Sequence, residues 1–249
     1  MTTVTATNPT LQSKAEHVKS AWTSLYTLGG ISAFLMVLII IIQLIIFMSA
    51  PQPLDGTALD WFMLFQKNML IGLIGFELLM IVYMILFIPL ALALFILFRR
   101  ASPSWTTLYL ALSLIGVMCF ITARPAFEML TLSNGYYAAN TDALRAAFLA
   151  AGEAKLASFH GTAFQISYIL GSIAGLIISF VMLKTNVFSK TTAYVRIASS
   201  VCDFGLYIPT VGIYISILSV LFLFIWNILV ARRLFQLGKV SGNIRGAIK

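Results

Sequence analysis

The stretch LYTLGGISAFLMVLIIIIQLIIFM, residues 25–48, decides the fold class of this chain. It carries no charged side chain, and it is longer than the roughly 20 residues that a helix needs to cross the hydrocarbon core of a bilayer. Pro51 and Pro53 follow it, and proline cannot donate a hydrogen bond to a continuing helix, so the helix should end there. The stretch therefore predicts a transmembrane helix, and Trp61 and Phe62, in the loop that follows, predict an aromatic belt at the membrane interface.

Five further apolar segments repeat this pattern along the chain. The predicted spans are residues 25–48, 69–98, 105–122, 160–183, 193–208 and 211–234. The composition agrees, because 60% of the 249 residues are hydrophobic and only 10% are charged, whereas about a quarter are charged in a soluble domain. We predict an all-α polytopic membrane protein, a bundle of six transmembrane helices, with no segment outside the spans long enough to bury a core of its own.

The segments outside the spans divide the chain into three regions. We predict a polar cytoplasmic segment at 1–20, a six-span domain at 21–238 and a basic cytoplasmic tail at 239–249. The apolar run after the first region is too long for the core of a signal peptide, so the first span should serve as the targeting signal. Residues 140–158, before the fourth span, predict an amphipathic helix that is capped by Asn140 or Thr141 and lies on the membrane surface or over the bundle mouth.

The distribution of lysine and arginine predicts the orientation. With six spans, 12 of the 16 basic residues fall on the side of the N-terminus and 4 on the other, and cytoplasmic loops are the ones enriched in these residues. Both termini should therefore be cytoplasmic. The excess of positive charge is explained by topology and by contact with anionic headgroups, so nucleic acid is not a predicted partner.

Small residues recur every four positions in the fourth span, at Ser167, Gly171, Gly175 and Ser179. This spacing places them on one helix face, where another backbone can approach closely. We predict packing within the monomer, with homo-oligomerisation through this span as the alternative, and we expect Gly171→Leu to weaken the contact. Gln43 and Asn227, both inside spans, predict hydrogen bonds between helices.

Polar side chains in the outer half of the membrane predict a pocket open to the extracytoplasmic side. Its candidate ligand-binding residues are Glu77, Arg124, His160, Gln165 and Asp203, with hydroxyl groups available from Tyr168, Tyr207 and Tyr214. A charge at the centre of a span costs ~2.5–3.5 kcal/mol on insertion scales, so such residues need a partner, water or neutralisation. Arg124 should pair with Glu77 or Asp203. The alternative is a structural ion pair beside side chains that extend to the headgroups.

The sequence leaves the function open among three classes. A membrane binding, sensor or accessory protein is the first, a transporter of small solutes or lipids is the second, and an intramembrane hydrolase, with or without a metal ion, is the third. The chain has two histidines, His17 and His160, on opposite sides of the membrane, whereas a catalytic zinc site needs about three protein ligands. No hydrolase, phosphate-loop or dinucleotide motif occurs. We predict no catalytic residue, metal or cofactor; the predicted partners are the lipid bilayer and a small-molecule or lipid ligand.

Residues 171–238 carry a family resemblance. The segments concerned are GSIAG at 171–175, VFSK at 187–190, YIP at 207–209, IW at 225–226 and RRLFQLG at 232–238. This region resembles the bacterial six-span integral membrane proteins grouped as domain of unknown function 4386. The resemblance implies a multi-pass protein of the bacterial inner membrane, and it implies no activity and no site residue.

Overall fold

The computed structural model describes residues 22–50, 52–53, 56–208 and 212–246, with the side chains of 213, 216 and 240–246 excepted. The predicted N-terminal segment 1–20 and His17 lie outside the described residues. Every regular element in the described part is a helix. The α-helices are α2 (Thr23–Ser49), α3 (Ala58–Lys67), α4 (Met69–Gly75), α5 (Leu78–Phe98), α6 (Pro103–Thr122), α7 (Ala126–Ala138), α8 (Asp142–Phe159), α9 (Thr162–Leu183), α10 (Lys190–Asp203) and α11 (Gly212–Gly246), and η1 (Phe204–Tyr207) is a 3₁₀-helix.

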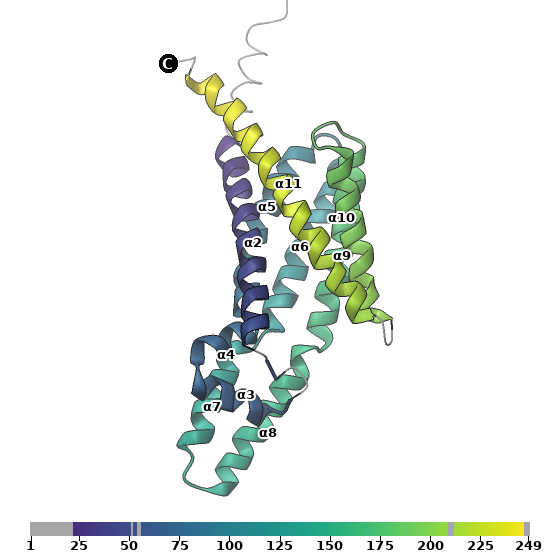
Figure 1. Cartoon of the computed structure of the whole chain (residues 1–249). Helices are drawn as coiled ribbons and strands as arrows, with labels where there is room; N and C mark the ends of the chain where they lie inside the picture. The colour runs from purple at the N-terminus through teal and green to yellow at the C-terminus, as the bar shows by residue number, and fades with distance from the viewer. Residues whose placement is uncertain (1–21, 51, 54–55, 209–211, 247–249) are drawn as a thin grey trace, which may run out of the picture.

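Six helices form the bundle, and their contacts close a ring. In order, α2 packs on α5, α5 on α6, α6 on α9, α9 on α10, α10 on α11, and α11 returns to α2. Figure 1 shows α11 crossing the bundle diagonally until its end lies near the start of α2. The core inside this ring is apolar, with Met36, Leu94, Ile178 and Trp226 almost fully buried.

The prediction of an all-helical membrane-type protein is confirmed, with five helical stretches long and apolar enough to cross a bilayer. These are Thr23–Ser49, Leu78–Phe98, Pro103–Ala138, Asp142–Leu183 and Ile217–Lys239. The predicted fifth span is not among them, because α10 has 14 residues and is polar at Thr191, Thr192, Ser199 and Ser200. At the other end of the chain, α11 continues without a break through the predicted boundary at 238.

The predicted span 69–98 is not one helix. Its first part is the short helix α4, and the chain then turns at Glu77, the one non-glycine residue with a positive φ (62°) among the described residues. This left-handed conformation costs a non-glycine residue about 1–2 kcal/mol. Gln43 of α2 donates to the carbonyl of Ile74 beside this break (3.3 Å), and Asn227 donates to the hydroxyl of Tyr83 (3.1 Å), so both predicted interhelical hydrogen bonds are confirmed.

Helices α3, α4, α7 and α8 form a separate body at one end of the bundle, which we call the cap (Figure 1). Its core contains Trp61, Phe62, Phe65, Phe76 and Met129. The expectation that no segment outside the spans buries a core is therefore wrong. It failed because the apolar residues of the cap are shared among four short helices, none of which is long enough to stand out alone.

The predicted amphipathic helix is present as α8, and its cap is Thr141, whose hydroxyl accepts from the backbone N–H of Leu144 (3.2 Å). The helix does not lie alone along a membrane surface, because it packs against α7 and α3. Gly152 allows this approach: a Cβ atom there would lie 2.6 Å from the ring of Phe62 and 2.9 Å from the Cβ of Ala58. Leu149 and Leu156 of α8 thus pack against the core of the cap, whereas Leu144 is exposed.

The small residues of α9 pack inside the monomer, as predicted, but not at each predicted position. A Cβ atom at Gly175 would lie 2.3 Å from the hydroxyl oxygen of Ser200 on α10, so α9 and α10 need glycine there. At Gly171 nothing lies within 4 Å of such an atom. The close approach therefore lies one turn further along the helix, towards Ser179, which is fully buried, and the expected effect of Gly171→Leu stays a prediction.

Candidate functional site: the cap–bundle junction

Three of the connections between the bundle and the cap meet at Arg124. This residue lies between α6 and α7, and Glu77 lies between α4 and α5. Phe159 is the last residue of α8, and His160 follows it before α9. Proline at 125 cannot continue α6, so the chain turns and the arginine side chain is directed inward. Its side chain is 1% exposed.

The guanidinium of Arg124 has a charged partner and a backbone partner. Its Nε lies 2.5 Å from Oε2 of Glu77, and an Nη donates to the carbonyl of Phe159 at 2.7 Å. Of the two predicted pairings of Arg124, the structure therefore contains the one with Glu77. The same pairing accounts for the left-handed backbone at Glu77, since a buried charge-assisted hydrogen bond offsets the conformational cost.

Aromatic rings enclose the rest of the guanidinium. Its central carbon lies 4.4 Å from the ring centroid of Phe120, 4.2 Å from that of Phe159 and 4.5 Å from that of Phe164. Cation–π contact of this kind strengthens when the cation is desolvated. Since the three rings come from α6, α8 and α9, the arginine holds together helices of both the cap and the bundle.

The other predicted site residues extend from this junction. The ring of His160 packs edge-on against Phe159 and Phe164, with centroids 4.8 and 5.3 Å apart. Gln165 donates to the carbonyl of His160 (3.3 Å), and its own carbonyl accepts from the hydroxyl of Tyr207 (3.0 Å).

Asp203 lies at the end of α10 and has a different environment from Glu77. Its carboxylate accepts from the hydroxyl of Ser172 (3.5 Å), and Ser219 of α11 is close by. No hydrogen bond or ion pair joins it to Glu77 or Arg124 within the described part of the chain. The charges of Glu77 and Asp203 both act on the hydroxyl of Tyr168. Tyr214 is 72% exposed.

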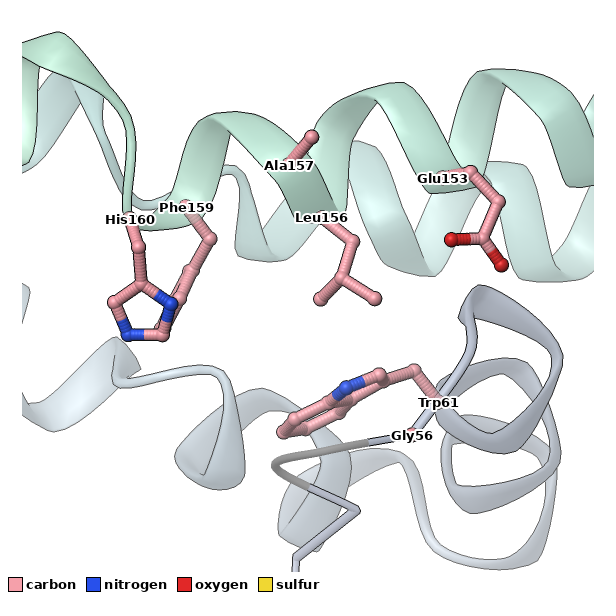
Figure 2. Close-up of a pocket in the computed structure, with 7 residues that line it drawn as sticks. All are labelled: Gly56, Trp61, Glu153, Leu156, Ala157, Phe159 and His160. Carbon is pink, nitrogen blue, oxygen red and sulfur yellow. The ribbon is translucent and has the colours of Figure 1, made fainter. Parts of the chain in front are cut away.

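A cavity of about 370 Å³ lies on the cap side of the junction. Figure 2 shows its wall: Glu153, Leu156, Ala157, Phe159 and His160 come from α8 and its end, and Trp61 and Gly56 face them from the start of α3. The volume is in the range of small-molecule sites. Of the five predicted residues, His160 lines this cavity, and the ligand-binding role of the other four stays a prediction.

Trp61 is the residue of this cavity that the sequence interpretation misplaced. With Phe62 it was expected in an aromatic belt at the membrane interface, but both side chains are buried in the cap, at 2% and 0% exposure. A signal for this was available. Ala58, Trp61, Phe62 and Phe65 have the i, i+3, i+4, i+7 spacing of an amphipathic helix, and Thr57 and Asp60 form the capping box at its start.

The cavity also contains unused hydrogen-bonding capacity. The indole N–H of Trp61 is buried and has no hydrogen-bond partner among the described residues. Glu153 uses one carboxylate oxygen to accept from the backbone N–H of Ala58 (2.8 Å), which leaves the second oxygen free to accept from another donor. No group of three His, Cys, Asp or Glu residues that could hold a metal ion occurs in the searched part of the chain.

Comparisons with known proteins add no assignment. No family model, no curated protein and no solved structure matches the chain.

Proposed function

We propose that the chain is a multi-pass binding or sensor protein of the bacterial inner membrane that binds a small organic amine in the cap cavity. The observation that carries the proposal is the position of that cavity. It is bounded by Phe159 and His160, the two residues at which α8 passes into the bundle helix α9. A ligand there is in contact with the connection between the cap and the membrane part.

The lining supports an amine with an apolar body. Trp61, Leu156 and Phe159 offer apolar and aromatic surface, and the carboxylate of Glu153 lies at one end of the cavity (Figure 2). A carboxylate beside an indole face suits an organic cation, since the ion pair and the cation–π contact act on the same group.

Arg124 supplies the proposed route from the cavity to the bundle. It holds the carbonyl of Phe159, and it is bound to Glu77 at the start of α5. A ligand that displaces Phe159 changes the Arg124 contacts, so the starts of α5 and α9 respond together. The differential affinity of the ligand for the two arrangements would set the size of the response.

In the same proposal, α10 together with η1 is the sixth crossing. Fourteen α-helical residues and four 3₁₀ residues rise about 29 Å, close to the ~30 Å hydrocarbon core. Figure 1 supports this reading, since α10 runs beside α9 from the end at which α11 finishes to the end that bears the cap. Six crossings return both termini to one side, which the lysine and arginine count makes cytoplasmic. The cap is then extracytoplasmic.

The test is binding of phenethylamine to the purified full-length protein in detergent, measured by calorimetry. Glu153→Gln should weaken affinity about tenfold, because the amide keeps an oxygen for the N–H of Ala58 while the charge is lost. Glu128→Gln on α7 is the matched control, as an exposed carboxylate that does not line the cavity. No saturable binding by the wild type, or equal loss in the two variants, would refute the proposal.

A transporter is the second candidate, and the break at Glu77 favours it. Transporters commonly bind substrate where a transmembrane helix is interrupted, and the left-handed Glu77 separates α4 from α5. Proteoliposome flux of phenethylamine separates the two functions. A binding or sensor protein should bind the amine without moving it across the bilayer.

A further inference from the structure

Besides Arg124, Arg196 is the other buried arginine among the residues whose side chains the structure describes. The lysine and arginine count assigned it to the cytoplasmic side, but it lies in the middle of α10 and is 7% exposed inside the bundle. The ion pairs among the described residues are Arg124 with Glu77 and Arg145 with Asp142, so no described carboxylate lies within 4 Å of Arg196. Its position therefore calls for some other compensation of charge.

The contacts that Arg196 makes do not neutralise it. It donates to the hydroxyl of Ser199 at 3.2 Å, and its guanidinium lies 5.2 Å from the ring centroid of Trp226. Asp203 is two helical turns away on the same helix, about 10 Å along the axis; it is bound to Ser172 and Ser219, and its charge acts on Arg196 only at that distance. The guanidinium thus retains hydrogen-bonding capacity and a positive charge in a low-dielectric interior.

Further donors lie near it. The hydroxyl of Ser200 and the indole N–H of Trp226 are buried and make no hydrogen bond within the described part of the chain, and the buried hydroxyls of Tyr109 and Ser113 have no described partner other than each other. Ser200 is adjacent to Arg196, since a Cβ atom at Gly175 would touch both side chains.

The two donors on α6, Tyr109 and Ser113, lie near the height of Arg196 along the bundle. Gly116 of α6 packs against the backbone of α9 at Ser167 and Gly171. Because the two helices run antiparallel, Ser113 and Tyr109, one and two turns earlier, approach the level of Gly175. The guanidinium charge of Arg196 acts on the hydroxyl of Tyr109.

We propose that this cluster binds one compact monovalent anion, held by Arg196 with hydrogen bonds from Ser200, Tyr109 and Trp226. All of these groups are hydrogen-bond donors, and an anion satisfies donors and balances the guanidinium charge at once. A water molecule would accept hydrogen bonds from the hydroxyls, but it would leave the guanidinium charge unbalanced. The ion must be small, because α9 and α10 are in close contact at Gly175. This site is separate from the cap cavity and does not depend on the function proposed for it.

The experiment measures the melting temperature of the full-length protein in detergent and sodium gluconate, an anion too large for the cluster, during titration with sodium chloride or sodium formate at constant ionic strength. A saturable rise of about 5 °C at high occupancy is expected for at least one of the two anions. Arg196→Gln should abolish the response. Arg232→Gln, an exposed arginine on α11, is the matched control and should retain it.

Tyr109→Phe and Ser200→Ala keep the charge and remove single donors, so they should fold and bind the anion several-fold more weakly. If Arg196→Gln does not fold, the anion affinities of these two variants test the proposal instead. A wild-type response that is absent, or that rises without saturation and equally in Arg196→Gln and Arg232→Gln, would overturn the proposal, as would unchanged anion affinity in both donor variants.

Discussion

The closest approach between α2 and α5 offers a direct test of how the bundle is packed. A Cβ atom at Gly29 would lie 2.7 Å from the Cβ of Ala93, 3.3 Å from a methyl of Leu234 and 3.5 Å from the carbonyl of Pro89. The first of these neighbours is fixed to its helix backbone and cannot rotate away. Gly29→Ala must therefore move α2 relative to α5.

The expected cost of that movement is about 1–3 kcal/mol, the usual penalty for overpacking a well-packed core. Gly171→Ala is the matched control, because nothing lies within 4 Å of its Cβ position, and alanine gains up to about 1 kcal/mol over glycine within a helix. Both substitutions carry that gain, so the two variants should differ by the overpacking cost alone, roughly 1–3 kcal/mol, or about 2–12 °C in melting temperature for a chain of this size. Gly175→Ala should fall between them, since Ser200 and Arg196 can turn aside.

The assay is thermal unfolding of detergent-solubilised variants, followed by the loss of the monodisperse peak in size-exclusion chromatography. The double variant Gly29→Ala/Ala93→Gly removes the opposing Cβ atom and should recover most of the lost stability. Equal melting temperatures for the Gly29 and Gly171 variants, or no recovery in the double variant, would refute the helix register described above.

Three further predictions concern the cap. Arg124→Gln leaves Glu77 without its partner and should cost roughly 3–5 kcal/mol, measured by the same melting assay; a loss below 1 kcal/mol would contradict the junction described above. The Thr57 N–H and hydroxyl, each 2.8 Å from Asp60, lower the pKa of that carboxyl. The stability that these hydrogen bonds contribute is therefore fully present above the ordinary pKa near ~3.9 and is lost as pH falls through the lowered pKa. Hydrogen exchange at the start of α3 should accelerate over that acidic range, and Asp60→Asn should flatten the pH dependence. Gly152→Val should disrupt the packing of α8 on α3 and make the cap sensitive to proteolysis, while Gly171→Val at the open position should not.

The membrane character of the fold was predictable because it depends on composition over long segments. Residues 25–48 carry no charge, and the chain forms one helix there. The break at Glu77 was not predictable in this way. The residues on both sides of it are good transmembrane residues, and the turn depends on Arg124, 47 positions away. A long-range ion pair leaves no trace in the local pattern.

The cap was missed for a related reason. Its core joins residues from α3, α4, α7 and α8, which lie as far apart in sequence as Ala58 and Phe159. The helical spacing of the apolar residues in α3 could be recognised in the sequence, but each helix alone buries too little apolar surface to indicate a domain. The candidate site was predicted in its charged members, Glu77 and Arg124, whereas the cavity depends on Trp61, which was predicted only as an interfacial aromatic, and on Glu153, which was not among the predicted site residues.

The two buried arginines show why burial alone does not assign a role. Arg124 has a carboxylate, a backbone carbonyl and three aromatic rings, so its charge is compensated and its removal would leave Glu77 uncompensated. Arg196 has a serine hydroxyl and one indole, and the free groups around it are donors. The first arrangement is complete and explains how the cap is attached to the bundle. The second is complete only with an acceptor that carries negative charge, and this difference is what makes Arg196 a binding site rather than a second structural ion pair.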